Sequence, residues 1–276
     1  MTFDLIELLK TVAIGIIEGI TEWLPVSSTG HMLLFDAFVP LKMTEEFKEM
    51  FFVVIQLGAI LAVVAMFWEK MNPLVIDKRK ISLDKTTLGI WLRVAAACLP
   101  SAVVGLIADD WLEANFGSPV TVSAMLILYG IAFIAVEKKN KNKPPKRFSL
   151  AGIDLKTAVM IGFFQVLSLI PGTSRSGATI LGALLLGVSR TAAAEFTFFL
   201  AVPTMLGASV LKILKFGFAF SQAELITLII GMAVAFAVSM LAVKFLMDYV
   251  RRRDFTAFGI YRIVLGAAVI AVFYLL

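Results

Sequence analysis

The sequence predicts an all-α polytopic membrane protein with a single integral membrane domain over residues 1–276. Three observations support this prediction. Apolar residues make up 60% of the chain and charged residues 16%, whereas soluble domains carry about 45–50% and about 25%. The mean hydropathy is +0.93. Apolar segments run from one end of the chain to the other, and six of them reach the roughly 20 residues that a membrane-spanning helix needs. A soluble enzyme and a disordered chain are excluded.

In chain order, an apolar segment interrupted by Pro, Gly and hydroxyl residues comes first, and three spans follow it. A second interrupted segment and three more spans complete the chain. Each interrupted segment is expected to form a helix, a break and a second helix. The interrupted segments lie at about 5–38 and 157–190, and the spans at about 50–68, 89–108, 118–136, 194–214, 223–246 and 259–276.

Basic residues predict the orientation of the spans, because Lys and Arg concentrate in cytoplasmic loops. The connections at 69–88, 137–156 and 247–258 hold more than half of the 25 Lys and Arg residues, whereas 109–117 is acidic and 215–222 holds one base. Three inside and two outside connections fit six spans only if both interrupted segments are re-entrant, the first from outside and the second from inside. The residues used are Lys70, Lys78, Arg79, Lys80, Lys85, Lys138, Lys139, Lys141, Lys143, Lys146, Arg147, Lys156, Arg251, Arg252 and Arg253, against Asp109, Asp110, Glu113 and Lys215.

The two halves of the chain also resemble each other. Gly15 and Gly162 lie 147 positions apart, as do Phe51 and Phe198, and each interrupted segment carries a Pro, Gly and hydroxyl motif. These matches predict an inverted-topology repeat, each half being one re-entrant hairpin and three transmembrane helices. Its parts are repeat 1 at about 1–136, a basic cytoplasmic linker at about 137–156 and repeat 2 at about 157–276.

The two breaks are the predicted site. Non-helical backbone at membrane depth survives only where protein or a water-filled cavity satisfies its polar groups. In an inverted repeat the breaks would face each other near the midplane, each offering the N-terminus of its second helix. Helix N-termini carry free N–H groups and partial positive charge, which favours an anion.

The first break carries acid–base groups. Glu18 and Glu22 share one helix face, and carboxylates at such depth are usually functional. Ser27, Ser28 and Thr29 offer an N-cap, and His31 is the only histidine of the chain. A structural alternative has Glu22 capping a helix near the interface, Glu18 paired with an Arg, and His31 in a structural role.

The second break carries Arg175 among the hydroxyl residues Ser174, Ser176 and Thr179. An arginine beside hydroxyls and glycines at a helix start suits phosphate oxygens. The alternative is that Arg175 snorkels or neutralises Glu18. Four other charged residues lie near the cytoplasmic ends of spans, where snorkelling is expected and no chemistry is assigned. They are Arg93, Glu195, Lys244 and Arg262.

Together these groups suit phosphoryl transfer, with a hydroxyl or imidazole as nucleophile and a carboxylate as proton carrier. A divalent cation, Mg²⁺ or Ca²⁺, bridging Glu18 and Glu22 to a diphosphate is a further expectation. The net charge of +5 is attributed to cytoplasmic loops rather than to a nucleic-acid partner. Cys98, the only cysteine, excludes an intrachain disulfide.

At these residues the sequence resembles the undecaprenyl-diphosphate phosphatase family of the bacitracin-resistance type. The resemblance rests on Glu18 to His31 and on Pro171 to Thr179. The segments at 193–203 and 260–262 also resemble that family, so the likeness covers essentially the whole chain. It implies hydrolysis of undecaprenyl diphosphate to undecaprenyl phosphate and inorganic phosphate, which recycles the carrier for peptidoglycan and other envelope polymers. It also implies bacitracin resistance, a bacterial plasma membrane location with the site open to the outer face, a divalent cation and a homodimer.

The resemblance implies a catalytic set of Glu18, Glu22, Ser28, His31 and Arg175. Ser28 is the expected nucleophile, with His31 as the rival that would give a phosphohistidine. Phosphate binding is expected from Ser27, Thr29, Ser174, Arg175, Ser176 and Thr179. The competing class is an alternating-access transporter or flippase of a polyprenyl phosphate, because such carriers share broken helices and inverted repeats.

Overall fold

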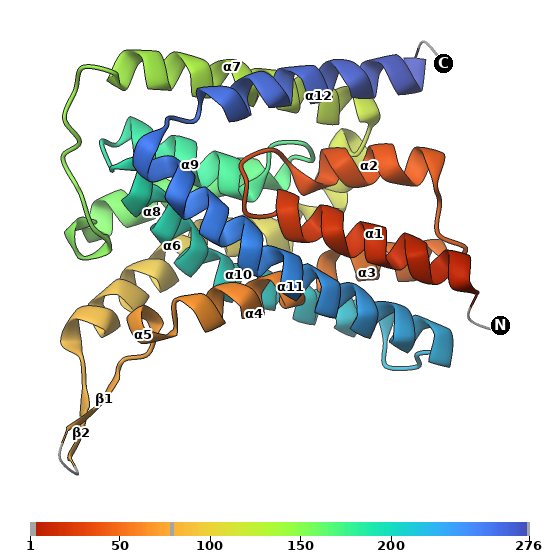
Figure 1. The fold of residues 1–276 in the computed structure, drawn as a ribbon, viewed down its shortest axis with the longest axis horizontal. Helices are drawn as coiled ribbons and strands as arrows, with labels where there is room; N and C mark the ends of the chain where they lie inside the picture. Colours follow the sequence, from red (N-terminus) through yellow and green to blue (C-terminus); the bar gives the residue numbers. More distant parts are fainter. Residues whose placement is uncertain (1–3, 78–79, 275–276) are drawn as a thin grey trace.

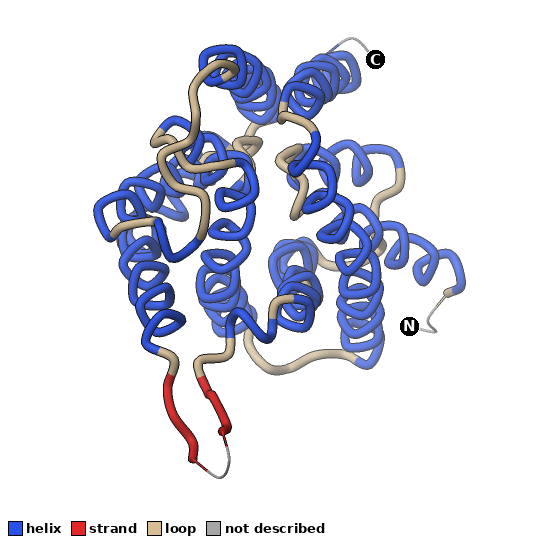
Figure 2. Tube along the Cα trace, turned by 60° about the vertical axis from the view of Figure 1, so that its left-hand side comes forward, coloured by secondary structure: helices blue, strands red, loops and turns tan. Residues whose placement is uncertain are grey.

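The computed structural model describes residues 4–77 and 80–274. The described residues fold almost entirely into helices. The exception is an antiparallel hairpin of β1 (Leu74–Asp77) and β2 (Lys80–Leu83), which projects from one end of the helices (Figure 2). The sequence did not predict this hairpin, which lies within the basic connection 69–88. Two of the basic residues assigned to that connection, Lys78 and Arg79, fall outside the described residues.

Six helical stretches among the described residues are long and apolar enough to cross a membrane. Each overlaps one predicted span, so the prediction of an all-α polytopic membrane protein is confirmed. The first stretch joins two helices and the other five are single helices. They are α3 (Glu45–Val54) with α4 (Gln56–Met66), α6 (Lys85–Phe116), α7 (Pro119–Asn140), α10 (Arg190–Phe216), α11 (Gln222–Arg252) and α12 (Thr256–Tyr274).

One predicted connection is wrong in extent. Helix α6 continues to Phe116, so most of 109–117 is helical rather than a loop. Acidic residues end an apolar run without ending a helix, because Glu has good helix propensity and Asp costs little. The chain turns only at 117–118, where the Ser118 hydroxyl accepts a hydrogen bond from Thr121 N at 3.3 Å and Pro119 begins α7. The side chains of Asp109, Asp110 and Glu113 lie outside the description.

Both interrupted segments form a helix, a break and a helix, as predicted. Helix α1 has 17 residues and α8 has 12, so each is too short to span a bilayer alone. The first break covers 22–27, and the second covers 170–174 after a short 3₁₀ turn. The elements are α1 (Leu5–Thr21), α2 (Ser28–Phe38), α8 (Leu155–Val166), η2 (Leu167–Leu169) and α9 (Arg175–Leu185), with α5 (Trp68–Met71) and η1 (Leu150–Gly152) as short connections.

Three close helix pairs frame the molecule: α1 with α11, α8 with α6, and α7 with α12 (Figure 1). Glycines permit the first two. A Cβ at Gly15 would lie 2.8 Å from Cβ of Val234 on α11, and one at Gly162 would collide with the carbonyl oxygen of Ala97 on α6. Each interrupted segment is therefore packed against a predicted span from the other half of the chain.

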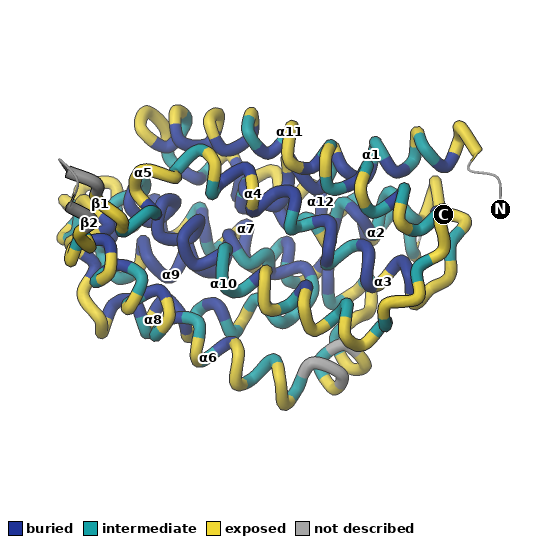
Figure 3. The backbone as a smooth tube through the Cα atoms, turned by 90° about the horizontal axis from the view of Figure 1, so that it is seen from below, coloured by how far each residue is buried: buried dark blue, intermediate teal, exposed yellow. Residues whose placement is uncertain are grey.

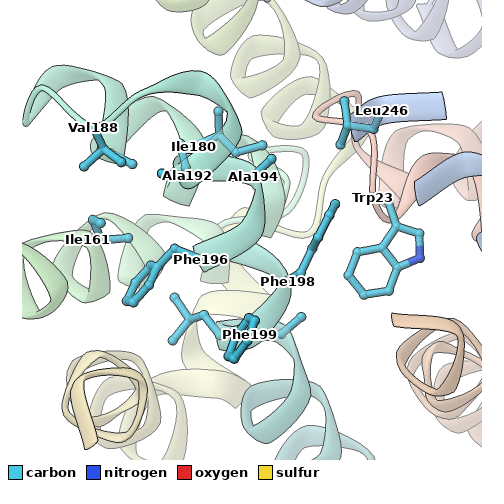
Figure 4. Packing of buried hydrophobic residues seen from close by; sticks show 14 of the residues in the cluster. Trp23, Ile161, Ile180, Val188, Ala192, Ala194, Phe196, Phe198, Phe199 and Leu246 are labelled. Atoms are coloured by element: carbon cyan, nitrogen blue, oxygen red, sulfur yellow. The ribbon is translucent and has the colours of Figure 1, made fainter. Parts of the chain in front are cut away.

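The core lies between these pairs and is rich in aromatic side chains. Figure 4 shows Phe196, Phe198 and Phe199 of α10 beside Trp23 of the first break, whose ring meets Phe198 edge to face at 5.3 Å. Figure 3 shows exposed positions along the outer helices α6 and α11. Apolar residues are among them, for example Leu106 of α6, which is 69% exposed. An apolar outer surface around a packed core is what a lipid environment allows.

The two broken segments enter the molecule from opposite ends. The chain termini lie at the end opposite the β1–β2 hairpin (Figure 1). Helix α1 begins at the terminal end, where the Lys10 ammonium donates to Pro40 O at 2.6 Å. Helix α9 ends at the hairpin end (Figure 1), where Lys146 N donates to Gly187 O at 2.7 Å. The two breaks consequently meet in the interior.

Candidate active site

The first and second breaks are joined by direct hydrogen bonds. The Ser176 hydroxyl donates to Glu22 O at 3.0 Å, and Arg175 Nη2 donates to Glu22 Oε1 at 2.9 Å. Residues separated by about 150 positions are thus brought together, and both sequence motifs lie in one place as predicted.

A serine with a positive φ begins the second helix of each segment. Ser27 has φ 74° and Ser174 has φ 68°, and these are the only non-glycine residues with positive φ in the described chain. Each hydroxyl caps its helix by accepting from the backbone N–H three residues on, Gly30 N at 3.3 Å and Gly177 N at 3.2 Å. Such backbone conformations are costly for a residue with a Cβ and cluster at functional sites. The two caps lie 147 positions apart.

Glu22 is the centre of the hydrogen-bond network. Its Oε2 accepts from the Ser28 hydroxyl at 3.0 Å, while Oε1 accepts from Arg175. The side chain is 8% exposed. The carboxylate therefore does not cap a helix at the interface, and Arg175 pairs with Glu22 rather than with Glu18.

The guanidinium group of Arg175 is held by a backbone carbonyl and an aromatic ring. Nη1 donates to Thr197 O at 3.0 Å, and the guanidinium carbon lies 5.7 Å from the centre of the Trp23 ring. Thr179 supports the same corner, its hydroxyl lying 2.9 Å from the hydroxyl of Thr197. Arg175 Nε is buried without a partner. A fixed guanidinium with donor capacity to spare suits an anion.

Further buried polar atoms around the breaks lack partners. Glu18 is 1% exposed, and its Oε1 accepts no hydrogen bond. Trp23 Nε1 and Thr173 Oγ1 are also buried without a hydrogen-bond partner. Buried polar groups are nearly always satisfied in proteins, so their concentration here marks a place where water or a ligand completes the network.

His31 is engaged through both ring nitrogens. Nδ1 lies 2.7 Å from Ser27 O, and a carbonyl can only accept, so Nδ1 carries a proton. Nε2 lies 2.7 Å from the hydroxyl of Tyr261 on α12, and in neutral His31 it accepts that hydrogen bond. Tyr261 was not anticipated from the sequence. Of the remaining predicted residues, Thr29 is exposed at the first turn of α2.

Comparison with known proteins assigns the chain to a family. A family model described as bacitracin resistance protein BacA matches residues 11–268. The chain belongs to this family. It is 63% identical to an undecaprenyl-diphosphatase of Enterococcus faecalis over 273 residues, 99% of each chain. It is 56% identical to one of Desulfitobacterium hafniense, over 98% of this chain and 97% of the other, and 54% identical to one of Acetivibrio thermocellus, over 98% of each.

Arg262 of this family member corrects a prediction. The sequence placed it near a span end with a snorkelling side chain, yet it is 0% exposed. Its guanidinium donates to Pro25 O at 3.2 Å in the first break and to Gly172 O at 2.8 Å and Thr173 O at 2.9 Å in the second. Arg262 therefore joins the two breaks through their carbonyl groups, and it is a positioning residue.

Two other charged residues also have partners that snorkelling does not provide. Glu195 accepts from Lys70 Nζ at 2.6 Å, and Arg93 Nη1 donates to the carbonyls of Ala151 and Ile153 at 3.1 and 2.9 Å. The first contact joins α10 to α5, and the second joins α6 to η1 and the residue that follows it. Lys244 is exposed, as expected.

Proposed function

We propose that the chain hydrolyses undecaprenyl diphosphate to undecaprenyl phosphate and inorganic phosphate. Its relatives bear the name undecaprenyl-diphosphatase at 54–63% identity over nearly their whole length. The observation in the chain itself that carries the proposal is the hydrogen bond from Ser28 to Glu22, whose other oxygen pairs with Arg175. This arrangement couples a nucleophile, a base and an anion-binding group. The product lipid returns to the synthesis of peptidoglycan and other envelope polymers, which fits bacitracin resistance.

Ser28 is the proposed nucleophile. Its oxygen attacks the terminal phosphorus, its proton passes to Glu22, and the bond from that phosphorus to the bridging oxygen breaks. Undecaprenyl phosphate leaves, and water then hydrolyses the phosphoserine to release phosphate and restore the hydroxyl. Arg175 would exchange Glu22 for phosphate oxygens when the substrate binds, which would free the carboxylate to take the proton.

The hydroxyls and the helix starts would complete the phosphate site. Ser174 and Ser176 lie within 3.2 Å of each other at the start of α9, next to Arg175. Ser27 and Thr29 lie at the start of α2, and Thr179 is one turn into α9. Ser28, Arg175 and Ser176 are all hydrogen-bonded to Glu22, so both halves of the chain would contribute to the diphosphate site.

The contacts of His31 favour the serine over the histidine as nucleophile. A phosphorylated histidine needs a free ring nitrogen, and Ser27 O and Tyr261 hold both. Rapid quenching of the enzyme with substrate labelled at the terminal phosphate should trap an acid-stable adduct that Ser28→Ala lacks. An acid-labile adduct lost in His31→Ala would overturn this assignment.

A divalent cation, Mg²⁺ or Ca²⁺, belongs to the proposal. The donor chemistry fits, because Glu18 Oε1 is a buried carboxylate oxygen without a partner and hard cations favour such oxygens. The described residues hold no group of three or more His, Cys, Asp or Glu side chains suited to a metal, so the diphosphate would supply the other ligands. Glu18 and Glu22 would hold the ion, which would neutralise phosphate charge.

We also propose the inverted repeat and the orientation derived from the basic connections. The matching serine caps 147 positions apart and the crossed packing of α1 on α11 and α8 on α6 support the repeat. Cytoplasmic basic loops would make the first break accessible from the outer face of a bacterial plasma membrane. In a Cys98→Ala background, single cysteines at exposed Lys42 and Lys141 should react with an impermeant thiol reagent only from outside and only from inside, respectively. The reverse labelling pattern would refute the orientation.

A homodimer is proposed from the family resemblance. Light scattering of the protein in detergent should give the mass of two chains after subtraction of the micelle. A mass of one chain would contradict it.

The phosphatase is tested by phosphate release. The protein purified in detergent should liberate inorganic phosphate from undecaprenyl diphosphate, and Ser28→Ala and Arg175→Ala should reduce release to background. Ser209→Ala is the matched control, since its buried hydroxyl donates to Val53 O between α10 and α3 and to neither break. A polyprenyl phosphate carrier would release no phosphate and would tolerate Ser28→Ala.

A further inference from the structure

A cavity lies at the hairpin end of the molecule, away from both breaks. Its volume is about 710 Å³, and it is bounded by the connection after α7, the turn from α9 to α10 and the end of α11. None of the residues of the proposed active site lines it. The volume is within the roughly 300–1,000 Å³ typical of ligand sites.

The rim of this cavity is basic and its charges are uncompensated. Lys139, Lys141, Lys143 and Lys146 line it and are exposed. None of the four forms an ion pair with the described part of the chain. The one carboxylate of the lining, Glu137, is already held by Arg190 at 2.9 Å and by Phe255 N at 3.1 Å. The rim therefore carries a net positive charge that a bound anion would balance.

Hydrogen bonds attach the connection after α7 to the end of α9. Asn140 Nδ2 donates to Leu184 O at 3.1 Å, and Arg147 Nη1 donates to Leu186 O at 3.2 Å. These bonds, with that from Lys146 N to Gly187 O, fasten the lysine-bearing connection to the end of α9. The backbone positions of the lysines are consequently fixed relative to α9.

The floor and one edge are apolar. Val188 and Val250 line the cavity and are buried, while Leu185, also of the lining, is 45% exposed. A site with a cationic rim and an apolar edge, at the end of membrane-spanning helices, offers charge to a headgroup and surface to an acyl chain.

We infer that this cavity binds the phosphate headgroup of an anionic phospholipid. Basic pockets between transmembrane helices on the cytoplasmic side are suited to such headgroups. A free phosphate ion would use the lysines but not the exposed apolar edge. The site is separate from the proposed hydrolysis, so neither proposal depends on the other.

The test measures lipid binding directly. Native mass spectrometry of the detergent-purified protein, titrated with phosphatidylglycerol, should show a bound lipid that phosphatidylcholine does not replace. The triple variant Lys139→Gln, Lys141→Gln, Lys143→Gln should bind it at least about tenfold more weakly, given the attraction of anionic lipid for each lysine. The matched triple Lys42→Gln, Lys85→Gln, Lys244→Gln removes the same charge from exposed positions outside the cavity and should bind as the wild type does.

Three results would overturn the inference. Equal loss in the two triple variants would show general charge attraction, and equal binding of phosphatidylcholine would show that the headgroup charge is not recognised. Displacement of phosphatidylglycerol by inorganic phosphate at equal concentration would show a free-anion site instead. Phosphate release from undecaprenyl diphosphate, measured on the same preparations, reports on the proposed enzyme independently.

Discussion

Arg262 gives the sharpest test of how the site is built. Replacing it by Met keeps an unbranched apolar side chain but removes every donor to the two breaks. Three carbonyl groups, those of Pro25, Gly172 and Thr173, lose hydrogen bonds of 2.8–3.2 Å. A buried group left unsatisfied costs about 1–3 kcal/mol. Taking the low end for each carbonyl, because water enters and the side chain is no longer a buried cation, the loss is about 3 kcal/mol.

The loss should appear both in stability and in catalysis. Without Arg262 the two breaks should move apart. Ser28 and Arg175 should then no longer both form hydrogen bonds with Glu22. We expect Arg262→Met to lower the melting temperature in detergent by several degrees and phosphate release by at least about a hundredfold, since small misplacement of reacting groups costs that much. Arg262→Lys should lie between, because a single ammonium cannot reach both breaks as a planar guanidinium does.

Arg93→Met is the matched control. Arg93 also donates to two carbonyls, those of Ala151 and Ile153. Neither carbonyl belongs to a break. The Arg93→Met variant should have a lower melting temperature, but its folded molecules should release phosphate at the wild-type rate. If Arg262→Met retained wild-type turnover at a temperature where it is folded, the positioning role would be refuted.

Three further predictions follow from single contacts. Glu22→Gln removes the base for Ser28 and should lower phosphate release by about 10²–10⁴-fold with the fold intact by circular dichroism; wild-type release would contradict it. Gly162→Ala forces α8 from α6 and should cost about 1–3 kcal/mol in thermal unfolding, whereas Gly207→Ala, with open space around it, should cost nothing. The ion pair with Arg147 holds the pKa of Asp154 well below its usual range, so its stabilisation is present above about pH 4 and is lost on further acidification. The melting temperatures of wild type and Asp154→Asn should therefore converge as the pH falls below about 4, and a constant difference would contradict this.

Composition and periodic apolar runs predicted the membrane-spanning helices because the bilayer sets their length. They did not predict where α6 ends, since acidic residues are compatible with a helix. They also missed the β1–β2 hairpin, because its antiparallel pairing depends on hydrogen bonds between the two strands rather than on hydropathy. Boundaries within polar connections are governed by local hydrogen bonds that an apolar pattern does not record.

The candidate site residues could be predicted because each is a polar group where lipid excludes polar groups. Glu22 and Arg175 stood out for this reason, and the structure places them in contact. Arg262 carried the same signal, as the sole charged residue of α12, but its distance from a span end in the sequence suggested snorkelling. Its role depends on the two breaks meeting beside α12, which no local pattern reveals. Tyr261 was missed for the same reason.

The two buried arginines differ in what they leave available. Arg262 is 0% exposed, and carbonyl groups of both breaks occupy its donors, so it fixes backbone and has little capacity for another partner. Arg175 has a carboxylate partner, an unpartnered Nε and a side chain that is 10% exposed. A carboxylate can be exchanged for a phosphate, whereas carbonyls of a folded backbone cannot be released without undoing the breaks. Structure and substrate binding are therefore assigned to different arginines, and a site of non-helical backbone inside a membrane needs both.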